Sequence, residues 1–297
     1  MGLAAARAVC PAQPEAGMAT EQATSRRSGL RADRAGNRRQ AGGTHAAATC
    51  MPAESERSER PSAACPPSGY LPVAGELAVD ISPRSRRRFR RSLAGWARGH
   101  LRTYPWRSTA DPYAVLVAEM LLRKTRADDA VPIYDRVMAR WPTLESMAAA
   151  TPGGLARVIA PIGLPSRARA MRDAALAVVT LHHGKVPDEE QDLLALPGVG
   201  RYISNAVLCF AHGRRVALVD GGVGRLLRRV FGLTSRKPAY CDGALWDLAD
   251  AMLPPRSAKR HNLALLDLAA ILCRPHRPSC GLCPLRSLCC ARGVFAQ

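Results

Sequence analysis

Residues 193–211 read LLALPGVGRYISNAVLCFA, two apolar and helix-like segments on either side of the five residues 196–200. Gly198 and Gly200 can both adopt a positive φ without a Cβ penalty, which permits a tight hairpin between two helices and leaves backbone N–H groups exposed. Those amides and the N-terminus of the following helix form a phosphate cradle that needs no side chain. An ordinary helix cap would look the same in sequence. Arg201 adds positive charge directly after the hairpin, and we therefore favour the phosphate interpretation.

Helical periodicity extends outward from this hairpin, from about Arg86 to the C-terminal cysteines. Apolar residues recur at steps of three to five, as in FRRSLAGWARGHL at 89–101, and short Gly/Pro connections separate the segments. No segment shows the alternation that is typical of a half-buried strand. The pattern predicts an all-α architecture of about ten helices.

Residues 1–82 have a different composition. They are rich in Ala, Gly, Ser, Pro, Arg and Glu and contain almost no aromatic residues. Such a segment cannot bury enough apolar surface to offset its chain entropy, so we expect a disordered tail. A wrongly assigned upstream start codon explains the segment equally well, with Met18 or Met51 as the alternative.

The charge of the chain points to an acidic partner. The 297 residues include 43 Lys+Arg and 24 Asp+Glu, a formal net charge of +19, and almost all of the excess lies in 81–297. This favours nucleic acid, an anionic membrane or an acidic substrate over a neutral small molecule. No stretch approaches the ~20 consecutive apolar residues of a membrane helix, and the N-terminus lacks the apolar core of a signal peptide. We expect an intracellular protein that does not bind a membrane.

Five of the ten cysteines crowd into 273–290. Cys273, Cys280, Cys283 and Cys289 form C-x6-C-x2-C-x5-C, and four thiolates on such short loops can surround one metal centre. This donor set suits either tetrahedral Zn or a [4Fe–4S] cluster, although zinc ribbons favour two C-x2-C pairs and this stretch has one. Cys290 could replace Cys289 as the fourth ligand.

The loop RPHRPS at 274–279, between the first two of these cysteines, is basic. A loop that a metal centre holds in place is suited to lie against a phosphate backbone, and Arg277 is our candidate contact. A solvated loop with no contact to a ligand is the alternative.

Glu119, Tyr202 and Asp220 form a third group of candidates. Glu119 lies on an apolar helix face in AVLVAEMLL, where burial should raise its pKa and suit it to proton transfer. Asp220 directly precedes a helix, and its default role is an N-cap, which is compatible with facing a cleft. Taken alone, Glu119 could instead pair with an arginine, and Tyr202 could be a core aromatic residue.

These motifs together resemble the helix–hairpin–helix–GPD DNA glycosylases, the superfamily of endonuclease III and MutY. The resemblance rests on LPGVG-R-Y, an Asp eighteen positions after that Tyr, and the C-x6-C-x2-C-x5-C ending, and it spans about 86–292 with YPWR, DPY and ALWDLAD. It implies a six-helix barrel at 108–215 and a second domain, 83–107 with 216–297, that holds a [4Fe–4S] cluster. Duplex DNA would lie across the cleft between them, and we expect a cytoplasmic, DNA-associated monomer.

The subgroup follows from differences within that family. Bifunctional enzymes of the endonuclease III type have Lys where this chain has Tyr202, so a monofunctional glycosylase is implied. The segments DPYAVLVAEMLLRKT, IGLPSRARA and HNLALLDLAAILC look most like the mismatch glycosylases that remove T or U opposite G. MutY-type enzymes usually read QQT where this chain reads Arg-Lys-Thr at 123–125, and usually append a C-terminal domain.

The resemblance also implies roles for the candidate residues. Asp220 would stabilise an oxocarbenium-like state, Glu119 would help the base depart, and Tyr202 would shape the pocket. Lys124 would fill the space of the extruded base or contact the orphan guanine. A MutY-type adenine glycosylase, acting on A opposite oxidised guanine or G, is the first alternative. The second is a non-catalytic DNA-binding protein with a structural metal.

Overall fold

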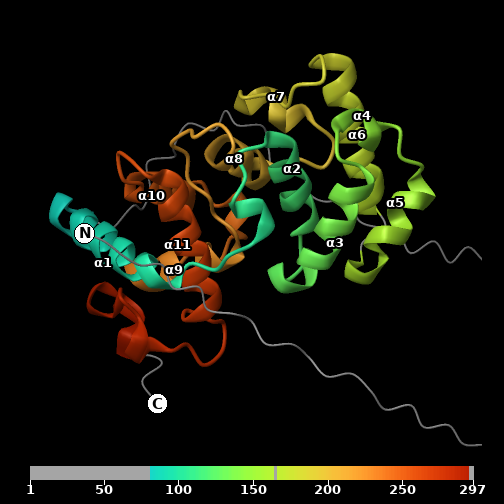
Figure 1. Ribbon diagram of the computed structural model, residues 1–297. Helices are drawn as coiled ribbons and strands as arrows, with labels where there is room; N and C mark the ends of the chain where they lie inside the picture. Colours follow the sequence, from blue (N-terminus) through green and yellow to red (C-terminus); the bar gives the residue numbers. More distant parts are fainter. Residues whose placement is uncertain (1–80, 164–165, 294–297) are drawn as a thin grey trace, which may run out of the picture. The chain divides into compact units, whose positions relative to one another are not determined.

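The computed structural model describes residues 81–163 and 166–293, which belong to one compact unit, Pro61–Gln297. The regular secondary structure of this part of the chain consists of helices, without strands (Figure 1), as expected for an all-α protein. The predicted tail at 1–82 lies almost wholly outside the described residues, which begin at Ile81. The α-helices are α1 (Pro83–His100), α2 (Pro112–Leu121), α3 (Ala127–Arg140), α4 (Leu144–Ala148), α5 (Pro152–Ile159), α6 (Ser166–Leu181), α7 (Glu190–Ala195), α8 (Arg201–Phe210), α9 (Gly221–Phe231), α10 (Gly243–Met252) and α11 (Ala258–Ile271).

Short polar caps determine where the site-bearing helices begin. Asp111 accepts hydrogen bonds from the amides of Tyr113 and Ala114 at the start of α2, where Pro112 occupies the first turn. Asp220 caps α9 in the same way. Because these side chains satisfy free N–H groups at the helix ends, both helices begin at defined residues.

The helices pack in two groups around one continuous core. In the first group, α2 contacts α3, α6 and α8, while α4 and α5 pack on α6. In the second, α1 packs on α10 and α11, and α9 packs on the same two helices, although α1 is distant from them in sequence (Figure 1). Phe89 and Leu93 of α1 and Trp246 of α10 are fully buried there.

The segment 211–220 crosses from α8 of the first group to α9 of the second. Asn205 donates to the carbonyl oxygen of Ala217 (2.8 Å), and Asn262 accepts from the amide of Leu218 (3.2 Å). These buried bonds fix the extended segment that ends at Asp220, and so the packing of α8 and α11 determines where that carboxylate lies.

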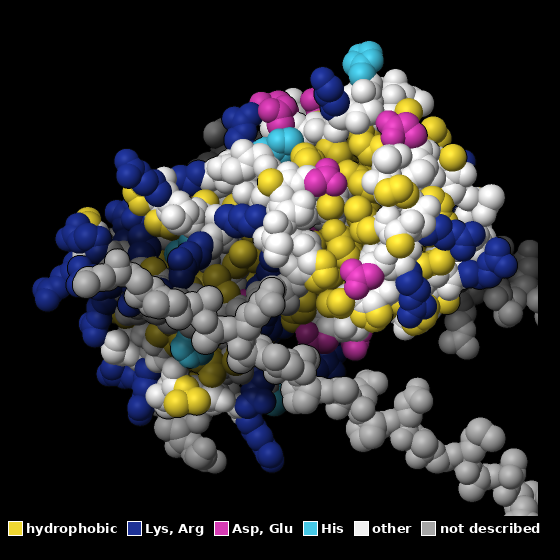
Figure 2. Space-filling view, in the orientation of Figure 1, with side chains coloured by type: hydrophobic (Ala, Val, Ile, Leu, Met, Phe, Trp, Pro, Cys, Tyr) yellow, Lys and Arg dark blue, Asp and Glu magenta, His cyan; other side chains and the backbone are white. Residues whose placement is uncertain are grey.

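Many Lys and Arg side chains of the face shown in Figure 2 gather over the part that contains α1 and α10, with fewer over the opposite part. None of the helices in the described ranges has the length and apolar composition that a membrane crossing requires.

Candidate active site and DNA-binding elements

The three residues predicted to be catalytic come together from three helices. Glu119 lies near the C-terminal end of α2, Tyr202 lies in the first turn of α8, and Asp220 is the N-cap of α9. The charges of Glu119 and Asp220 both act on the Tyr202 hydroxyl, and the charge of Asp220 also acts on Glu119. The structure therefore combines residues 101 positions apart in one electrostatically coupled site.

Glu119 is a buried carboxyl group. The residue is 4% exposed, every residue of α2 from 113 to 121 is buried, and its Oε2 atom has no hydrogen-bond partner among the described residues. Burial raises the pKa of Glu119 to about 8; the charge of Arg107 opposes the rise and that of Asp220 adds to it. A carboxyl group of this kind keeps its proton at neutral pH and can donate it.

Tyr202 is half-buried beside these carboxylates. Burial raises its pKa well above 10, and the charges of Glu119 and Asp220 raise it further. The side chain is therefore a neutral phenol, which cannot form the Schiff base that a lysine at the same position could form.

Asp220 is the N-cap of α9, as its default role in the sequence predicts. Its Oδ1 accepts a hydrogen bond from the Val223 amide (2.6 Å), which makes it the cap of α9, while the residue remains in contact with solvent. Burial of one side of the carboxylate raises its pKa above 3.8, and the backbone amides of Val223 and Gly222 oppose that rise. The hydrogen bond from Val223 fixes the orientation of the carboxylate at the start of α9.

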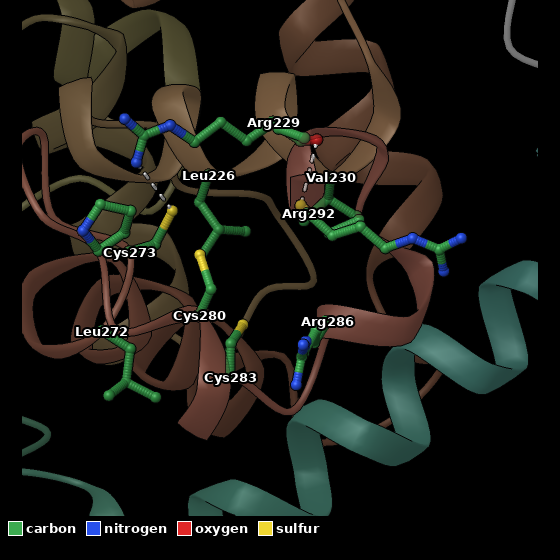
Figure 3. Close-up of a pocket in the computed structure, with 12 residues that line it drawn as sticks. Leu226, Arg229, Val230, Leu272, Cys273, Cys280, Cys283, Arg286 and Arg292 are labelled. Carbon is green, nitrogen blue, oxygen red and sulfur yellow. Dashed lines mark hydrogen bonds between the residues drawn. The ribbon is translucent and has the colours of Figure 1, made fainter. Parts of the chain in front are cut away.

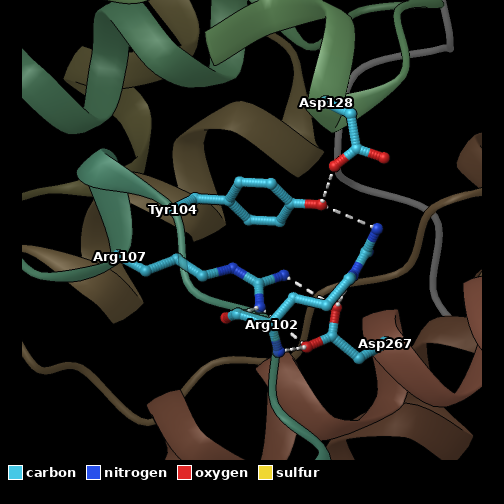
Figure 4. A network of polar contacts seen from close by, with 5 residues as sticks. All are labelled: Arg102, Tyr104, Arg107, Asp128 and Asp267. Carbon is cyan, nitrogen blue, oxygen red and sulfur yellow. Dashed lines mark hydrogen bonds and ion pairs between the residues drawn. The ribbon is translucent and has the colours of Figure 1, made fainter.

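Arg107, the last residue of YPWR, was assigned no role from the sequence, yet its charge reaches both Glu119 and Tyr202. It donates to Oδ2 of the buried Asp267 (2.7 Å), and Arg102 donates to Oδ1 of the same carboxylate (2.7 Å) (Figure 4). The hydroxyl of Tyr104 links Arg102 to Asp128 in the same network. This network fixes the guanidinium of Arg107 where its charge acts on Glu119 and Tyr202.

The hairpin requires glycine at one position only. Gly198 has φ +76, and a Cβ there would lie 2.8 Å from the Cβ of Ala170 and 3.3 Å from Cε of Met120. The expectation of a positive φ at Gly200 is wrong: its φ is −110, and a Cβ would meet nothing within 4 Å. Gly200 is instead the N-cap of α8 without a side-chain cap, so the first amides of that helix face open space beside the exposed Arg201.

Arg201 and Lys124 border this region in different ways. The guanidinium of Arg201 lies 4.2 Å from the centre of the Trp246 ring, which fixes a positive charge between α8 and α10. Lys124 is exposed in the turn between α2 and α3, and its φ is +53, a conformation that residues with a Cβ seldom adopt. Arg167, which the sequence had not singled out, holds this turn from α6 through hydrogen bonds to its carbonyl oxygens.

The four predicted ligand cysteines line one pocket behind α9 (Figure 3). The pocket encloses a cavity of about 30 Å³, the thiols of Cys273, Cys280, Cys283 and Cys289 are all free, and Cys290 is not among the lining residues. An N–H of Arg229 points at Sγ of Cys273 (3.6 Å). In the ranges that the structure describes, no three His, Cys, Asp or Glu side chains are arranged to hold a single metal ion.

The basic loop 274–279 is tied to α9. Arg229 donates to the carbonyl oxygens of Arg274 (2.7 Å) and Pro275 (2.9 Å), and Arg274 donates to that of Arg277 (3.2 Å). Arg277 is exposed and has φ +50. The loop therefore has a defined shape that presents Arg277 to solvent.

Residues 117–250 match the model of the "HhH-GPD superfamily base excision DNA repair protein" family. The chain is also 35% identical over 211 residues to a thymine/uracil-DNA glycosylase of Methanothermobacter thermautotrophicus. The matched residues are 71% of this chain and 96% of the relative. The chain belongs to the HhH-GPD superfamily of base excision DNA repair proteins. The family resemblance predicted from the motifs is thereby confirmed.

The share of the relative's length that this chain covers differs among other members of the superfamily. A thymine-DNA glycosylase of Aeropyrum pernix is 37% identical over 205 residues, 67% of this chain and 92% of the relative. The human adenine DNA glycosylase is 35% identical over 219 residues, but these are 70% of this chain and only 40% of that protein.

Solved structures agree with the HhH-GPD fold. A thermostable thymine-DNA glycosylase superimposes with a TM-score of 0.68 at 34% identity, over 72% of this chain and all of the other. Endonuclease III in a non-covalent complex with DNA superimposes with a TM-score of 0.61 at 22% identity, over 70% of this chain and 97% of that chain, which is a likeness of fold alone.

Proposed function

We propose that this HhH-GPD protein is a monofunctional DNA glycosylase that hydrolyses the N-glycosidic bond of a thymine or uracil mispaired with guanine. The observation that carries the proposal is the convergence of Glu119, Tyr202 and Asp220: a buried carboxyl group whose pKa is raised to about 8, a phenol, and a second carboxyl group that accepts a backbone hydrogen bond. The names of the relatives in Methanothermobacter and Aeropyrum, together with the coverage of their length, support the choice of base.

The residues divide the reaction between the sugar and the base. Asp220, oriented by the Val223 amide, stabilises the positive charge that develops on the sugar and orients the attacking water. Glu119, protonated at neutral pH, donates a hydrogen bond or a proton to the departing base; no other described residue forms a hydrogen bond with its Oε2. The charge of Arg107 favours a base that leaves as an anion.

Tyr202 limits the reaction to hydrolysis. A lysine at this position would attack the sugar carbon and cleave the strand through a Schiff base. A phenol with a pKa well above 10 stays uncharged and contacts the substrate without forming a covalent bond. We therefore expect base release without β-elimination of the strand.

We further propose that Cys273, Cys280, Cys283 and Cys289 hold a [4Fe–4S] cluster. Tetrahedral Zn, with Zn–S bonds near 2.3 Å, requires thiolates about 3.8 Å apart, and among the described residues no three such side chains are placed to hold one metal ion. A cluster binds each thiolate at a different iron, which fits four cysteines that line one pocket. When bound, the cluster would hold the loop 274–279 rigid against DNA. Broad visible absorption that is lost with the iron would support a cluster, and a colourless protein with one equivalent of zinc would exclude it.

DNA would bind across two parts of the molecule. We assign 108–215 to a six-helix barrel that carries the hairpin, and 83–107 with 216–297 to the cluster domain; the packing of α1 on α10 and α11 supports this division. The amides after Gly198 and Gly200, with Arg201, Lys124 and Arg277, would contact the duplex. Because all three catalytic groups come from one chain, a monomer suffices.

An adenine glycosylase of the MutY type is the second candidate. It shares the Glu at 119 and can carry the Tyr at 202, and adenine DNA glycosylases are among the relatives. The matched residues make up 40% of the human relative, so this chain aligns with less than half of that protein.

A base-release panel distinguishes these candidates. Duplexes that carry T or U opposite G, U opposite A, and A opposite oxidised guanine or G would be incubated with excess protein, and each free base quantified. We expect release of T and U opposite G, with intact strands before alkali treatment. Release of adenine alone would move the protein to the MutY type, and binding without release of any base would make it a non-catalytic DNA-binding protein.

A further inference from the structure

The turn that carries Lys124 is held in an unfavourable backbone conformation. Lys124 has φ +53 with its side chain exposed, between the end of α2 and the start of α3. A lysine in the left-handed region persists only where its surroundings impose that conformation. The turn itself supplies two bonds, Thr125 N–H to the carbonyl of Leu122 (3.1 Å) and Thr125 Oγ1 to that of Arg123 (3.2 Å).

The remaining bonds come from Arg167 of α6. This arginine is 2% exposed and donates to the carbonyl oxygens of Leu121 (2.8 Å) and Arg123 (2.5 Å) and to Oγ1 of Thr125 (3.1 Å). No ion pair of Arg167 occurs among the described residues; burial and the charge of Arg123 both lower its pKa. A buried cation that is balanced only by the carbonyl dipoles at the end of α2 is costly, and its planar fork fits this turn and few others.

The turn at 123–125 and the first part of α6 lie next to the hairpin at 196–200. The position that a Cβ on Gly198 would occupy lies 3.7 Å from a guanidinium nitrogen of Arg123, and 2.8 Å from the Cβ of Ala170, one helical turn after Arg167. The hairpin, the α2–α3 turn and α6 therefore meet at one point. A shift of the turn would move Lys124 relative to the part of the molecule that is expected to grip the phosphate backbone.

We propose that Arg167 is a positioning residue: it holds residues 123–125 in the conformation that presents Lys124 to the base opposite the excised nucleotide, and thereby sets the preference for guanine at that position. The inference rests on the proposed function and adds a determinant of selectivity to it. Arg167 does not touch the substrate; it acts through Lys124.

The test compares excision of uracil opposite guanine and opposite adenine, with kcat and KM for each. Arg167→Lys keeps the buried charge, but its donors all sit on one nitrogen and cannot reproduce the planar fork that reaches the three acceptors, so we expect it to reduce the guanine-to-adenine ratio about tenfold. Thr125→Val removes one of the three acceptors without leaving the cation unbonded, and should reduce the ratio less. Arg169→Met, at an exposed position on the same helix, removes a charge of the same kind and should leave the ratio unchanged.

A double-mutant cycle separates positioning from a loss of folding. In a Lys124→Ala background, Arg167→Lys should change the ratio no further, since the side chain through which Arg167 acts is gone. Equal loss of activity opposite both bases, or an effect on the ratio that persists in Lys124→Ala, would overturn the inference. If the parent protein releases no uracil from either duplex, the proposed function fails; if it releases uracil with a ratio that no variant alters, only this inference fails.

Discussion

At the scale of single residues, the site depends on two carboxyl groups in different surroundings. Glu119 lies inside an apolar helix with an unpartnered oxygen, whereas Asp220 accepts a backbone hydrogen bond and remains in contact with solvent. In the proposed mechanism, environment rather than residue type therefore makes Glu119 the proton donor and Asp220 the group that stabilises positive charge. Arg107 narrows the difference, because its charge, fixed in place by Asp267, lowers the pKa of Glu119 against the effect of burial.

The protonation of Glu119 should be visible in stability. Between pH 4.5 and about 8 the carboxyl group is ionised in the unfolded chain and protonated in the native protein, so the unfolded state binds fewer protons and stability falls as pH rises. Glu119→Gln replaces the carboxyl group by a neutral amide and so removes its contribution to the pH dependence of stability. Its stability relative to wild type should rise by up to about 1.4 kcal/mol per pH unit over that window, as measured by urea unfolding. Glu190→Gln, exposed on α7, is the matched control; a difference that does not vary with pH would refute the assignment.

Tyr202 should determine whether the strand is cut. Tyr202→Lys places an amine beside the sugar, where burial lowers the pKa of the lysine and makes it nucleophilic. We expect an adduct that borohydride traps on a uracil-containing duplex, together with strand cleavage. Tyr202→Phe, which keeps the ring, should give neither. Failure of the lysine variant to form an adduct while it still releases base would show that the residue does not face the sugar.

At the scale of elements, local patterns predicted the helices but not the contacts that align them. The all-α periodicity and the hairpin could be predicted from sequence, because each depends on a helical period or a short motif, whereas the grouping of Glu119, Tyr202 and Asp220 was predicted from the family resemblance. The ion pair of Arg107 with Asp267 joins residues 160 positions apart, and Arg167 acts only because α6 docks on the end of α2. Such contacts leave no local signal.

The two hairpin glycines should respond in opposite ways to the same substitution. Gly198→Ala places a Cβ 2.8 Å from that of Ala170 at φ +76, and should cost about 1–3 kcal/mol of stability. Gly200→Ala meets nothing within 4 Å, so the fold should be unaffected while the added methyl occupies the space in front of α8 and weakens DNA binding. Urea unfolding and binding to an undamaged duplex measure the two effects; equal effects on stability would contradict the geometry.

At the scale of the whole molecule, the formal charge of +19 and its position in 81–297 favour a grip on DNA that is independent of sequence. If six to ten phosphates are contacted, affinity for an undamaged duplex should fall about 10³–10⁵-fold between about 50 and 200 mM salt. Arg277→Ala should reduce the slope of log affinity against log salt by about 1. A slope near zero would contradict phosphate contacts by this protein altogether. A slope that Arg277→Ala leaves unchanged would remove Arg277 from the proposed interface.

The central claim is that Asp220 stabilises the charge on the sugar while it caps α9. Single-turnover release of uracil from a duplex with a U·G pair, compared between wild type and Asp220→Asn, tests it most directly. Because Asn is an equally good N-cap, the variant should keep its fold and its affinity for the duplex. We predict that release falls by at least about 10²–10³-fold. Release at the rate of the wild-type protein would contradict the account.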